Sequence, residues 1–359
     1  MNHSADETRA SLANNLRYFI KWSLIALLIG GTGGLIGSLF SMGVSFATSF
    51  RMNHPNMLFF LPVSGILIVW LYHTFHEEGN RGTNMVIDAI SSTEKVTLAT
   101  GPLIFVSTVL THIAGGSSGR EGAALQLGGS LGNLFGNAIH LDEKDKKIAI
   151  MCGMSAVFSA LFGTPVAAAI FPLEVISIGV LYYAALVPCI FSSFIGVGIA
   201  RYLGIAGEHF TVLSIPAISV SSVGWIIFLS ALCAGVSIVF CLMLHGAEHT
   251  YRKIFPNPYV RILAASAIFI LLTLLIGTRD YCGSSMPLIE RSMEGEIGYE
   301  AFFLKMLFTA IALGAGFKGG EIVPTLCVGA AFGCAFGQIT GFAPSLCAAC
   351  SMAALFAGV

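Results

Sequence analysis

The sequence predicts an all-α, polytopic membrane protein. Hydrophobic residues make up 55% of the 359 residues and charged residues only 10%, whereas about a quarter of the residues is charged in a typical soluble domain. So few charges cannot cover a soluble surface of this size, and the long apolar stretches predict helices that cross a bilayer. A net charge of −1 gives no indication of a nucleic-acid partner.

The apolar stretches predict a series of helices along the chain. In order they are 18–50, 57–75, 96–114, 147–161, 164–203 with a break near Ile178 and Gly179, 222–245, 259–277, 300–315 and 343–359. An upright spanning helix needs about 20 apolar residues, so the longer and shorter stretches predict tilted and partial helices. The polar residues 1–17 are expected to form a cytoplasmic leader.

Two glycine-rich segments, 115–136 and 314–337, interrupt this pattern although apolar residues continue through both. Irregular backbone at membrane depth is tolerated only where protein buries it or where it lines a polar cavity. These two segments are therefore the places where a functional site is expected.

The two segments also resemble each other, which indicates an internal repeat. Three blocks match in the same order at an offset near 200 residues: Gly119-Arg120-Glu121 with Gly319-Gly320-Glu321, Gly128, Gly132 and Gly136 with Gly329, Gly333 and Gly337, and Met154–Phe158 with Met352–Phe356. We expect a first transmembrane repeat at 18–205 and a second at 218–359. Because the first repeat continues past its third block, we expect the second to be incomplete at its C-terminal end.

The first segment places small residues ahead of Arg120 and Glu121, and a helix is expected to begin at Ala123. The free N–H groups and the dipole of a helix N-terminus favour an anion. An ionised Glu121 could occupy such an anion site itself, and a protonated Glu121 could leave it. The alternative is that Arg120 and Glu121 form a structural ion pair at a helix end.

The second segment repeats this arrangement. Gly319, Gly320 and Glu321 stand at the start of an apolar helix, with Pro324 in the first turn, where proline is tolerated. Lys318 precedes Glu321 by three residues and is a further candidate site residue. Two half-helices that point their N-termini at one place would form an anion pocket between the repeats.

These residues carry a family resemblance. The run Gly116–Gly122 resembles the G-(K/R)-E-G signature of CLC anion channels and transporters, and Phe162–Ala167 with Leu173-Glu174 and Gly319–Pro324 are similar to further motifs of that family. The resemblance covers about residues 20–359. It implies the inverted-repeat CLC-type helical fold with broken and tilted helices, a homodimer with one pore per subunit, and Glu121 as the gating, proton-exchanging glutamate.

The resemblance also implies the site residues. Besides Glu121, the anion-binding positions would be Gly116, Ser117, Ser118, Gly119, Arg120, Gly122, Thr83, Asn84, Gly319, Gly320, Ile322 and Val323. Glu321 would be a second carboxylate, on the proton path or in contact with the anion. No metal and no cofactor are expected.

Two readings of the transported ion stay open. Phe317–Glu321 is similar to the fluoride-selective branch of the family, and the inner proton-transfer glutamate of chloride exchangers would fall at Val175. Thr83, in contrast, keeps a hydroxyl donor as chloride members do. Fluoride is strongly hydrated and needs dense hydrogen-bond donors, which a protonated carboxyl supplies. Fluoride/proton antiport is therefore the favoured function, and a chloride channel or chloride/proton exchanger is the alternative.

Other classes of protein fit less well. An intramembrane enzyme would need Ser117 or Ser118 as nucleophile with His112 as base, and it would leave the second glycine-rich segment unexplained. A membrane scaffold has no need for irregular backbone at membrane depth. The expected partners are a halide anion, protons and the lipid bilayer, and the expected location is the bacterial inner membrane.

Overall fold

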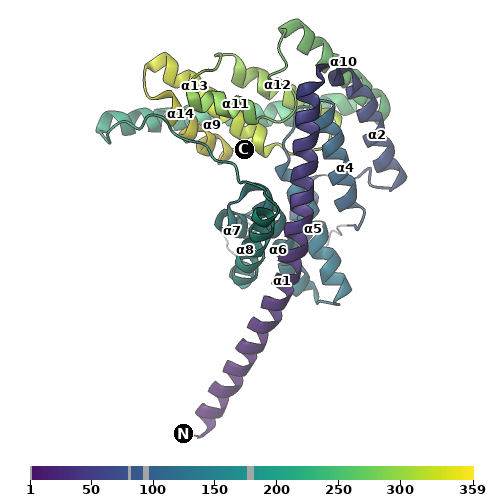
Figure 1. Ribbon diagram of the computed structural model, residues 1–359, viewed down its shortest axis with the longest axis vertical. Coiled ribbons are helices and arrows are strands. Elements are labelled where there is room, and N and C mark those ends of the chain that lie inside the picture. The colour runs from purple at the N-terminus through teal and green to yellow at the C-terminus, as the bar shows by residue number, and fades with distance from the viewer. Residues whose placement is uncertain (1, 80–81, 92–96, 176–181) are drawn as a thin grey trace. The chain divides into compact units, whose positions relative to one another are not determined.

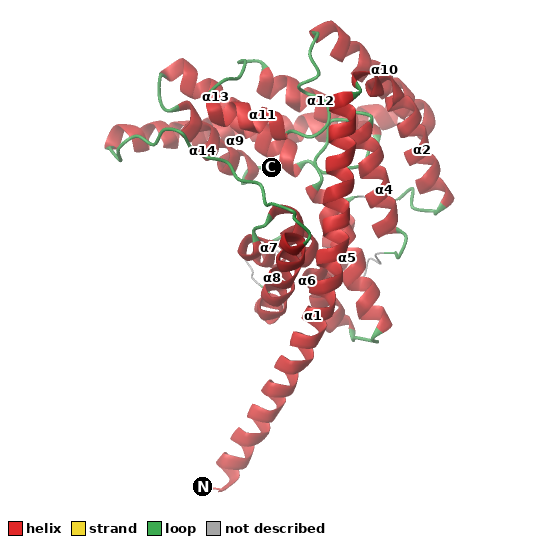
Figure 2. Cartoon of the chain, in the orientation of Figure 1, coloured by secondary structure: helices red, strands yellow, loops and turns green. Residues whose placement is uncertain are grey.

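The fold of this chain is built from helices that differ widely in length. The computed structural model describes residues 2–79, 82–91, 97–175 and 182–359, and it leaves the side chains of residues 2–13, 83, 84, 89 and 91 undescribed. Within these ranges there are 14 α-helices and no named strand, and six helices are long and apolar enough to span a membrane. The prediction of an all-α, polytopic membrane protein is therefore confirmed (Figures 1 and 2).

Short 3-10 helices, η1 and η2, stand among the α-helices of the chain. From the N-terminus to the C-terminus the elements are α1 (Asn2–Asn53), η1 (Pro55–Phe60), α2 (Leu61–Thr74), α3 (Thr83–Ser91), α4 (Thr100–Ile113), α5 (Glu121–Ala138), α6 (Glu143–Phe162), α7 (Pro165–Glu174), η2 (Tyr183–Ala185), α8 (Leu186–Tyr202), α9 (Val220–Ile254), α10 (Pro258–Ile276), α11 (Met286–Glu294), α12 (Ala301–Ala315), α13 (Ile322–Thr340) and α14 (Pro344–Phe356).

The apolar stretches locate most of these helices, and three differences have physical reasons. Helix α1 begins at Asn2, because the polar segment before its apolar run contains good helix formers such as alanine and leucine. Helices α3 and α11 lie outside the predicted apolar stretches. α11 is amphipathic, with Leu288, Ile289 and Met293 buried on one face, a pattern that a search for apolar runs does not detect. The expected break near Ile178 and Gly179 falls outside the described residues.

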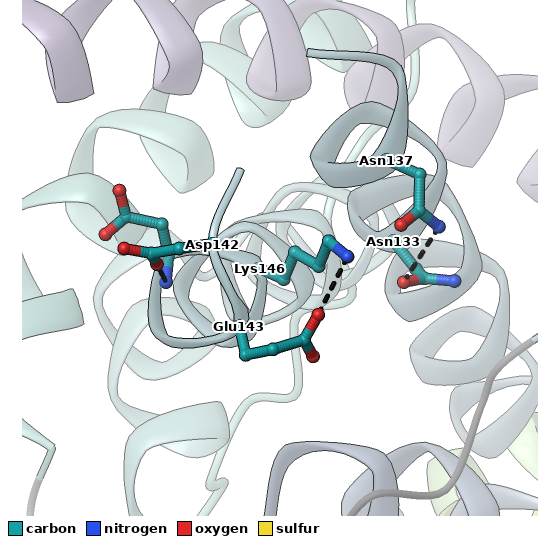
Figure 3. Close-up of polar contacts among 6 residues, drawn as sticks. Asn133, Asn137, Asp142, Glu143 and Lys146 are labelled. Carbon is teal, nitrogen blue, oxygen red and sulfur yellow. Dashed lines mark hydrogen bonds and ion pairs between the residues drawn. The ribbon is translucent and has the colours of Figure 1, made fainter. Parts of the chain in front are cut away.

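Helix ends follow local sequence. The Asp142 side chain caps α6 by accepting a hydrogen bond from the Asp145 N–H at 2.7 Å, and Ser219 forms a capping box with Ser222 at the start of α9. Such caps satisfy N–H groups that have no partner inside the helix. Figure 3 shows the Asp142 cap with the neighbouring ion pair in which Lys146 Nζ donates to Glu143 Oε1 at 2.9 Å.

The chain forms two compact units whose segments alternate along the sequence. The first comprises Met1–Met42, Arg81–Pro102 and Ala124–Glu208, and the second comprises Gly43–Asn80, Leu103–Ala123 and His209–Val359. Three of the five boundaries fall inside α1, α4 and α5.

In the first unit, α6, α7 and α8 pack against one another, and the three lie side by side in Figure 1. Helix α1 approaches α8 closely, because an added Cβ at Gly34 would come within 2.9 Å of the backbone of Gly196. Glycines at such crossings allow close backbone approach between membrane helices. Lys21 of α1 also forms an ion pair with Asp145 of α6.

In the second unit, α9, α12, α13 and α14 surround a hydrophobic core. Its buried members are Leu229, Cys233, Phe240, Met306, Val328, Phe336, Cys347 and Leu355. Helix α10 packs on α2 and α12, and α11 packs on α13 and α14. The core fixes α13, whose first turn carries part of the site described below.

Helices α5 and α6 of the first unit form a tight pair. An added Cβ at Gly128 or Gly132 would overlap the backbone carbonyl groups of Gly153 and Ala149, respectively. The two helix backbones are therefore in direct contact, which only glycine permits on the α5 side.

Helices α13 and α14 of the second unit form an equivalent pair. An added Cβ at Gly329 or Gly333 would overlap the backbone carbonyl groups of Ser351 and Cys347. The glycines that match in sequence thus make the same kind of contact in each unit, against positions that are also four residues apart. This equivalence supports the internal repeat that the sequence predicts.

Candidate functional site

The two glycine-rich segments meet through their backbones. The Gly119 N–H donates to the Gly320 carbonyl at 2.6 Å, and the Gly320 N–H donates to the Gly119 carbonyl at 2.9 Å. This reciprocal pair is an isolated antiparallel bridge. It brings together the starts of α5 and α13, and all of the residues involved belong to the second unit.

Close approach explains the glycines at this bridge. An added Cβ at Gly119 would overlap the Glu121 carboxylate, and one at Gly320 would lie 2.6 Å from the Gly122 nitrogen. A side chain at either position would separate the two helix starts.

Glu121 lies at the centre of this junction. Its side chain is buried, and its Oε2 accepts a hydrogen bond from the Val323 N–H in the first turn of α13 at 3.3 Å. The carboxylate therefore occupies the N-terminal end of a helix that begins about 200 residues later in the sequence. A helix N-terminus stabilises negative charge there.

The Arg120 guanidinium does not pair tightly with this carboxylate. Its Nε lies 3.9 Å from Glu121 Oε1, beyond hydrogen-bond distance. Among the described residues, Oε1 is buried without a hydrogen-bond partner. The geometry therefore favours the helix-end position of Glu121 over a structural ion pair with Arg120.

The loop before α5 is buried in the protein. The Gly116 N–H donates to the Thr111 carbonyl at 2.9 Å, and the Ser117 hydroxyl lies 3.0 Å from the Thr309 hydroxyl of α12. The Ser118 hydroxyl is buried, and no hydrogen bond to it is found in the described part of the chain. The Ser118 hydroxyl is thus a buried hydrogen-bond donor next to the Gly119–Gly320 bridge.

The second carboxylate, Glu321, is placed differently from Glu121. It is partly buried at the residue before α13, where its carbonyl accepts hydrogen bonds from the Thr325 N–H and hydroxyl, both at 2.8 Å. Its charge lies within electrostatic range of the Cys241 thiol on α9. The side chain of Glu321 does not cap its helix.

The remaining predicted residues fall into three groups. Gly319 packs against the Ser118 side chain, while Ile322 and Val323 form the first turn of α13. Lys318 places its ammonium group 4.2 Å from the centre of the Tyr72 ring. Thr83 and Asn84 begin α3 in the first unit, and their side chains lie outside the described part of the structure.

His112 is a packed residue of α4 and does not pair with either serine. Its Nδ1 lies 2.8 Å from the Thr108 carbonyl, and no hydrogen bond joins it to Ser117 or Ser118 among the described residues. The nucleophile–base contact that an intramembrane serine enzyme would need is therefore not formed.

Two residues beside this site were not predicted from the sequence. Lys305 of α12 is completely buried, and Arg51 of α1 lies against the Gly115 backbone. A lysine inside the apolar run 300–315 is itself a signal, because an ionisable residue within a membrane helix marks a functional site by default.

Two helix N-termini that meet at a buried carboxylate inside a helical membrane protein are suited to an anion site such as channels and transporters carry. The chain is a member of the family described as voltage gated chloride channel, whose model matches residues 64–359. It is thus a CLC-family membrane protein for anion transport and not an enzyme, as the sequence predicts.

Three known proteins show the extent of the similarity. The "Chloride/fluoride channel protein" of Pseudomonas syringae pv. tomato is 29% identical over 350 residues, covering 96% of this chain and 77% of that protein. The "H(+)/Cl(-) exchange transporter ClcA" of Vibrio cholerae is 25% identical, covering 93% and 77%. The crystal structure of a CLC-type fluoride/proton antiporter superposes with a TM-score of 0.89 at 30% identity, covering 95% of this chain and 87% of that one.

Proposed function

We propose that this protein exports fluoride in exchange for protons and that Glu121 is the gate. The observation that carries the proposal is the position of the Glu121 carboxylate, which accepts a hydrogen bond from the Val323 N–H at the start of α13. An anion that passes this point needs the same N–H donors. The carboxylate and the anion therefore compete for one site.

Competition of this kind links anion movement to protons. When Glu121 is ionised, it holds the helix end and excludes the anion. When it takes up a proton, it loses its charge and releases the N–H groups, and the anion replaces it. A cycle in which the anion leaves in one direction and the proton is carried in the other direction is antiport.

Fluoride is favoured over chloride for three reasons. Fluoride gives up its water only where donors are dense, and a protonated carboxyl, the Ser118 hydroxyl and the N–H groups of α13 are such donors. The second carboxylate at Glu321 follows Lys318-Gly319-Gly320, the pattern that resembles the fluoride-selective branch. The similarity to a fluoride/proton antiporter structure supports the same ion.

The test is efflux of anions from liposomes that contain the purified protein, with fluoride and chloride compared while the external pH is recorded. Faster fluoride efflux with opposite proton movement is expected. Equal or faster chloride efflux would overturn the choice of fluoride, and anion efflux without any proton movement would overturn antiport.

The proposal extends to the location of the protein, its oligomeric state and the remaining residues of the anion path. We place the protein in the bacterial inner membrane as a homodimer with one pathway per subunit, and we assign Gly116, Thr83 and Asn84 to the same anion path as Glu121. The two repeats would each supply one of the helix starts that meet at Gly119 and Gly320. Cross-linking of the protein in native membranes tests the dimer, and a single monomeric band would contradict it.

A further inference from the structure

A groove lined by apolar side chains lies between α9 and α10 of the second unit. The two helices follow each other along the chain, but α9 packs mainly on α12 and α14, and α10 packs mainly on α2 and α12. The space between them is therefore only partly filled. It has a volume of about 420 Å³, within the range of ligand-binding sites. The lining includes Leu242, Met243, Gly246, Ile254, Phe255 and Ile268.

The groove faces the surroundings of the helices and not the protein core. Its lining residues Leu242, Ile254 and Ile268 are 67%, 60% and 41% exposed. Because α9 and α10 are both long and apolar enough to span a membrane, an apolar surface on them meets the acyl chains of lipids. The lining from Leu242 to Phe255 follows about 20 Å of α9. The groove is thus long and narrow in the manner of a single acyl chain.

One end of the groove lies at the turn between the two helices, where a membrane surface is expected. Residues 220–244 of α9 contain no charged side chain, and neither does the part of α10 after Arg261. Tyr251 and Tyr259 flank the turn, and aromatic residues with a polar end are typical of the boundary between membrane and water. The charged residues of both helices gather at this end: Glu248, Arg252, Lys253 and Arg261.

The one acid of this group is already paired. Glu248 Oε1 accepts from the Arg252 guanidinium at 2.7 Å. Lys253 is exposed and adjoins Ile254 of the groove, and no ion pair of Lys253 is found in the described part of the chain. Its ammonium group is therefore an uncompensated positive charge beside the end of the groove.

Arg261 supplies a second cation at the same end. It precedes Ile268 by two helical turns, so both residues lie on one face of α10. Its Nε donates to the Ala315 carbonyl at 3.1 Å. A guanidinium group has five N–H donors, so this contact leaves others for a phosphate oxygen.

We propose that this groove binds an anionic phospholipid, with an acyl chain along α9 and the phosphate between Lys253 and Arg261. Basic residues at a membrane surface attract anionic lipids, and the apolar lining accepts the chain. A soluble anion would leave the apolar lining without a partner. A lipid with no net charge would gain little from the two cations. The site is remote in sequence from Glu121, and the proposal does not depend on the ion that is transported.

A fluorescent reporter in the groove tests the proposal. Phe255→Trp is introduced into the whole chain, which is purified in detergent, and its emission is compared with that of the three native tryptophans alone. Phosphatidylglycerol or phosphatidylcholine with brominated acyl chains is then added as a quencher. Phosphatidylglycerol should quench the added tryptophan at a lower mole fraction than phosphatidylcholine. Equal quenching by the two lipids would overturn the preference for an anionic headgroup.

The role of charge is measured in the same reporter chain. Lys253→Gln should require about fivefold more phosphatidylglycerol for half-maximal quenching and should leave the response to phosphatidylcholine unchanged. Arg201→Gln removes a cation from an exposed position in the last turn of α8 and should behave as the unaltered reporter. If Lys253→Gln matches Arg201→Gln, the phosphate does not lie at Lys253 and the proposal fails.

The role of the groove is measured by filling it. Nothing lies within 4 Å of an added Cβ at Gly246, so Gly246→Leu should place its side chain in the groove without displacing a helix. It should weaken quenching by both lipids. Gly235→Leu adds the same side chain at an equally open position of α9 outside the lining. Equal quenching in the two leucine variants would show that the acyl chain lies elsewhere.

A measurement without any substitution covers the case in which the tryptophan variant does not fold. Phosphatidylglycerol should raise the thermal unfolding midpoint of the unaltered chain more than phosphatidylcholine does, because a ligand that binds only the folded state stabilises it. Equal midpoints with the two lipids would contradict the site. Absence of quenching by either lipid would show that a different occupant, such as another segment of the protein or a second copy, covers the groove, and would overturn the proposal.

Discussion

The Glu121 carboxylate and the Val323 N–H are joined by a hydrogen bond of 3.3 Å, although the residues are separated by about 200 positions. Glu121 starts α5, and Val323 is the second residue of α13. One helix start therefore supplies the negative charge that the other helix start stabilises. The first prediction concerns this hydrogen bond between Glu121 and Val323.

Glu121→Gln is expected to abolish proton movement. A glutamine cannot take up or release a proton, so the side chain either stays on the Val323 N–H and blocks transport or leaves it permanently and allows uncoupled anion flow. Liposome efflux with external pH recording distinguishes these outcomes. Glu143→Gln, at an exposed carboxylate near the start of α6, is the matched control, and proton movement at the normal rate in Glu121→Gln would refute the gate.

Glu321→Gln is expected to lower fluoride transport more than chloride transport. The variant removes the carboxyl that we propose as a hydrogen-bond donor to the anion near the start of α13, while leaving Glu121 in place. The measurement is the ratio of fluoride to chloride efflux rates at one pH. An unchanged ratio would show that Glu321 takes no part in selecting the ion.

Gly333→Ala is expected to destabilise the protein by about 1–3 kcal/mol, because its methyl group would overlap the backbone of α14 and force the helices apart. Gly235→Ala is the control, since nothing lies within 4 Å of a Cβ at that position on α9. The control should be neutral or stabilising, because alanine is the better helix former. Thermal unfolding in detergent compares the two, and equal midpoints would contradict the tight α13–α14 contact.

Asp142→Ala is expected to destabilise α6 by about 1 kcal/mol, because the first turn loses the acceptor for the Asp145 N–H. Asp142→Asn should retain most of the stability, since asparagine is also a good N-cap residue. The same thermal measurement applies. An equal loss of stability in the two variants would show that the charge of Asp142, rather than its capping hydrogen bond, matters here.

The apolar runs and the glycine-rich breaks predicted the fold class and the helices that carry the site. Glu121 and Glu321 were predicted at helix starts, and both stand there. Apolar runs and glycine-rich breaks are local properties of the chain, so they can be recognised in the sequence without knowledge of the tertiary structure. The roles of these residues in transport stay predictions.

Three features of the site could not be predicted in this way. The Gly119–Gly320 bridge joins backbone groups across about 200 residues, and backbone pairing leaves no side-chain pattern beyond the glycines themselves. Arg51 lies in the last turn of α1 and resembles an ordinary helix-end cation in the sequence. Lys305 gave a signal, a lone charge in an apolar run, but its partners on the 281–283 loop depend on tertiary packing.

The two hydrogen bonds between Gly119 and Gly320 couple the backbone at the start of α5 to the backbone at the start of α13. Each bond contributes about 1 kcal/mol to holding them together, and neither involves a side chain. A force on the start of α13 therefore reaches the start of α5 directly. Because both bonds run between backbone groups, a substitution of the Glu121 side chain removes the carboxylate without removing either of them.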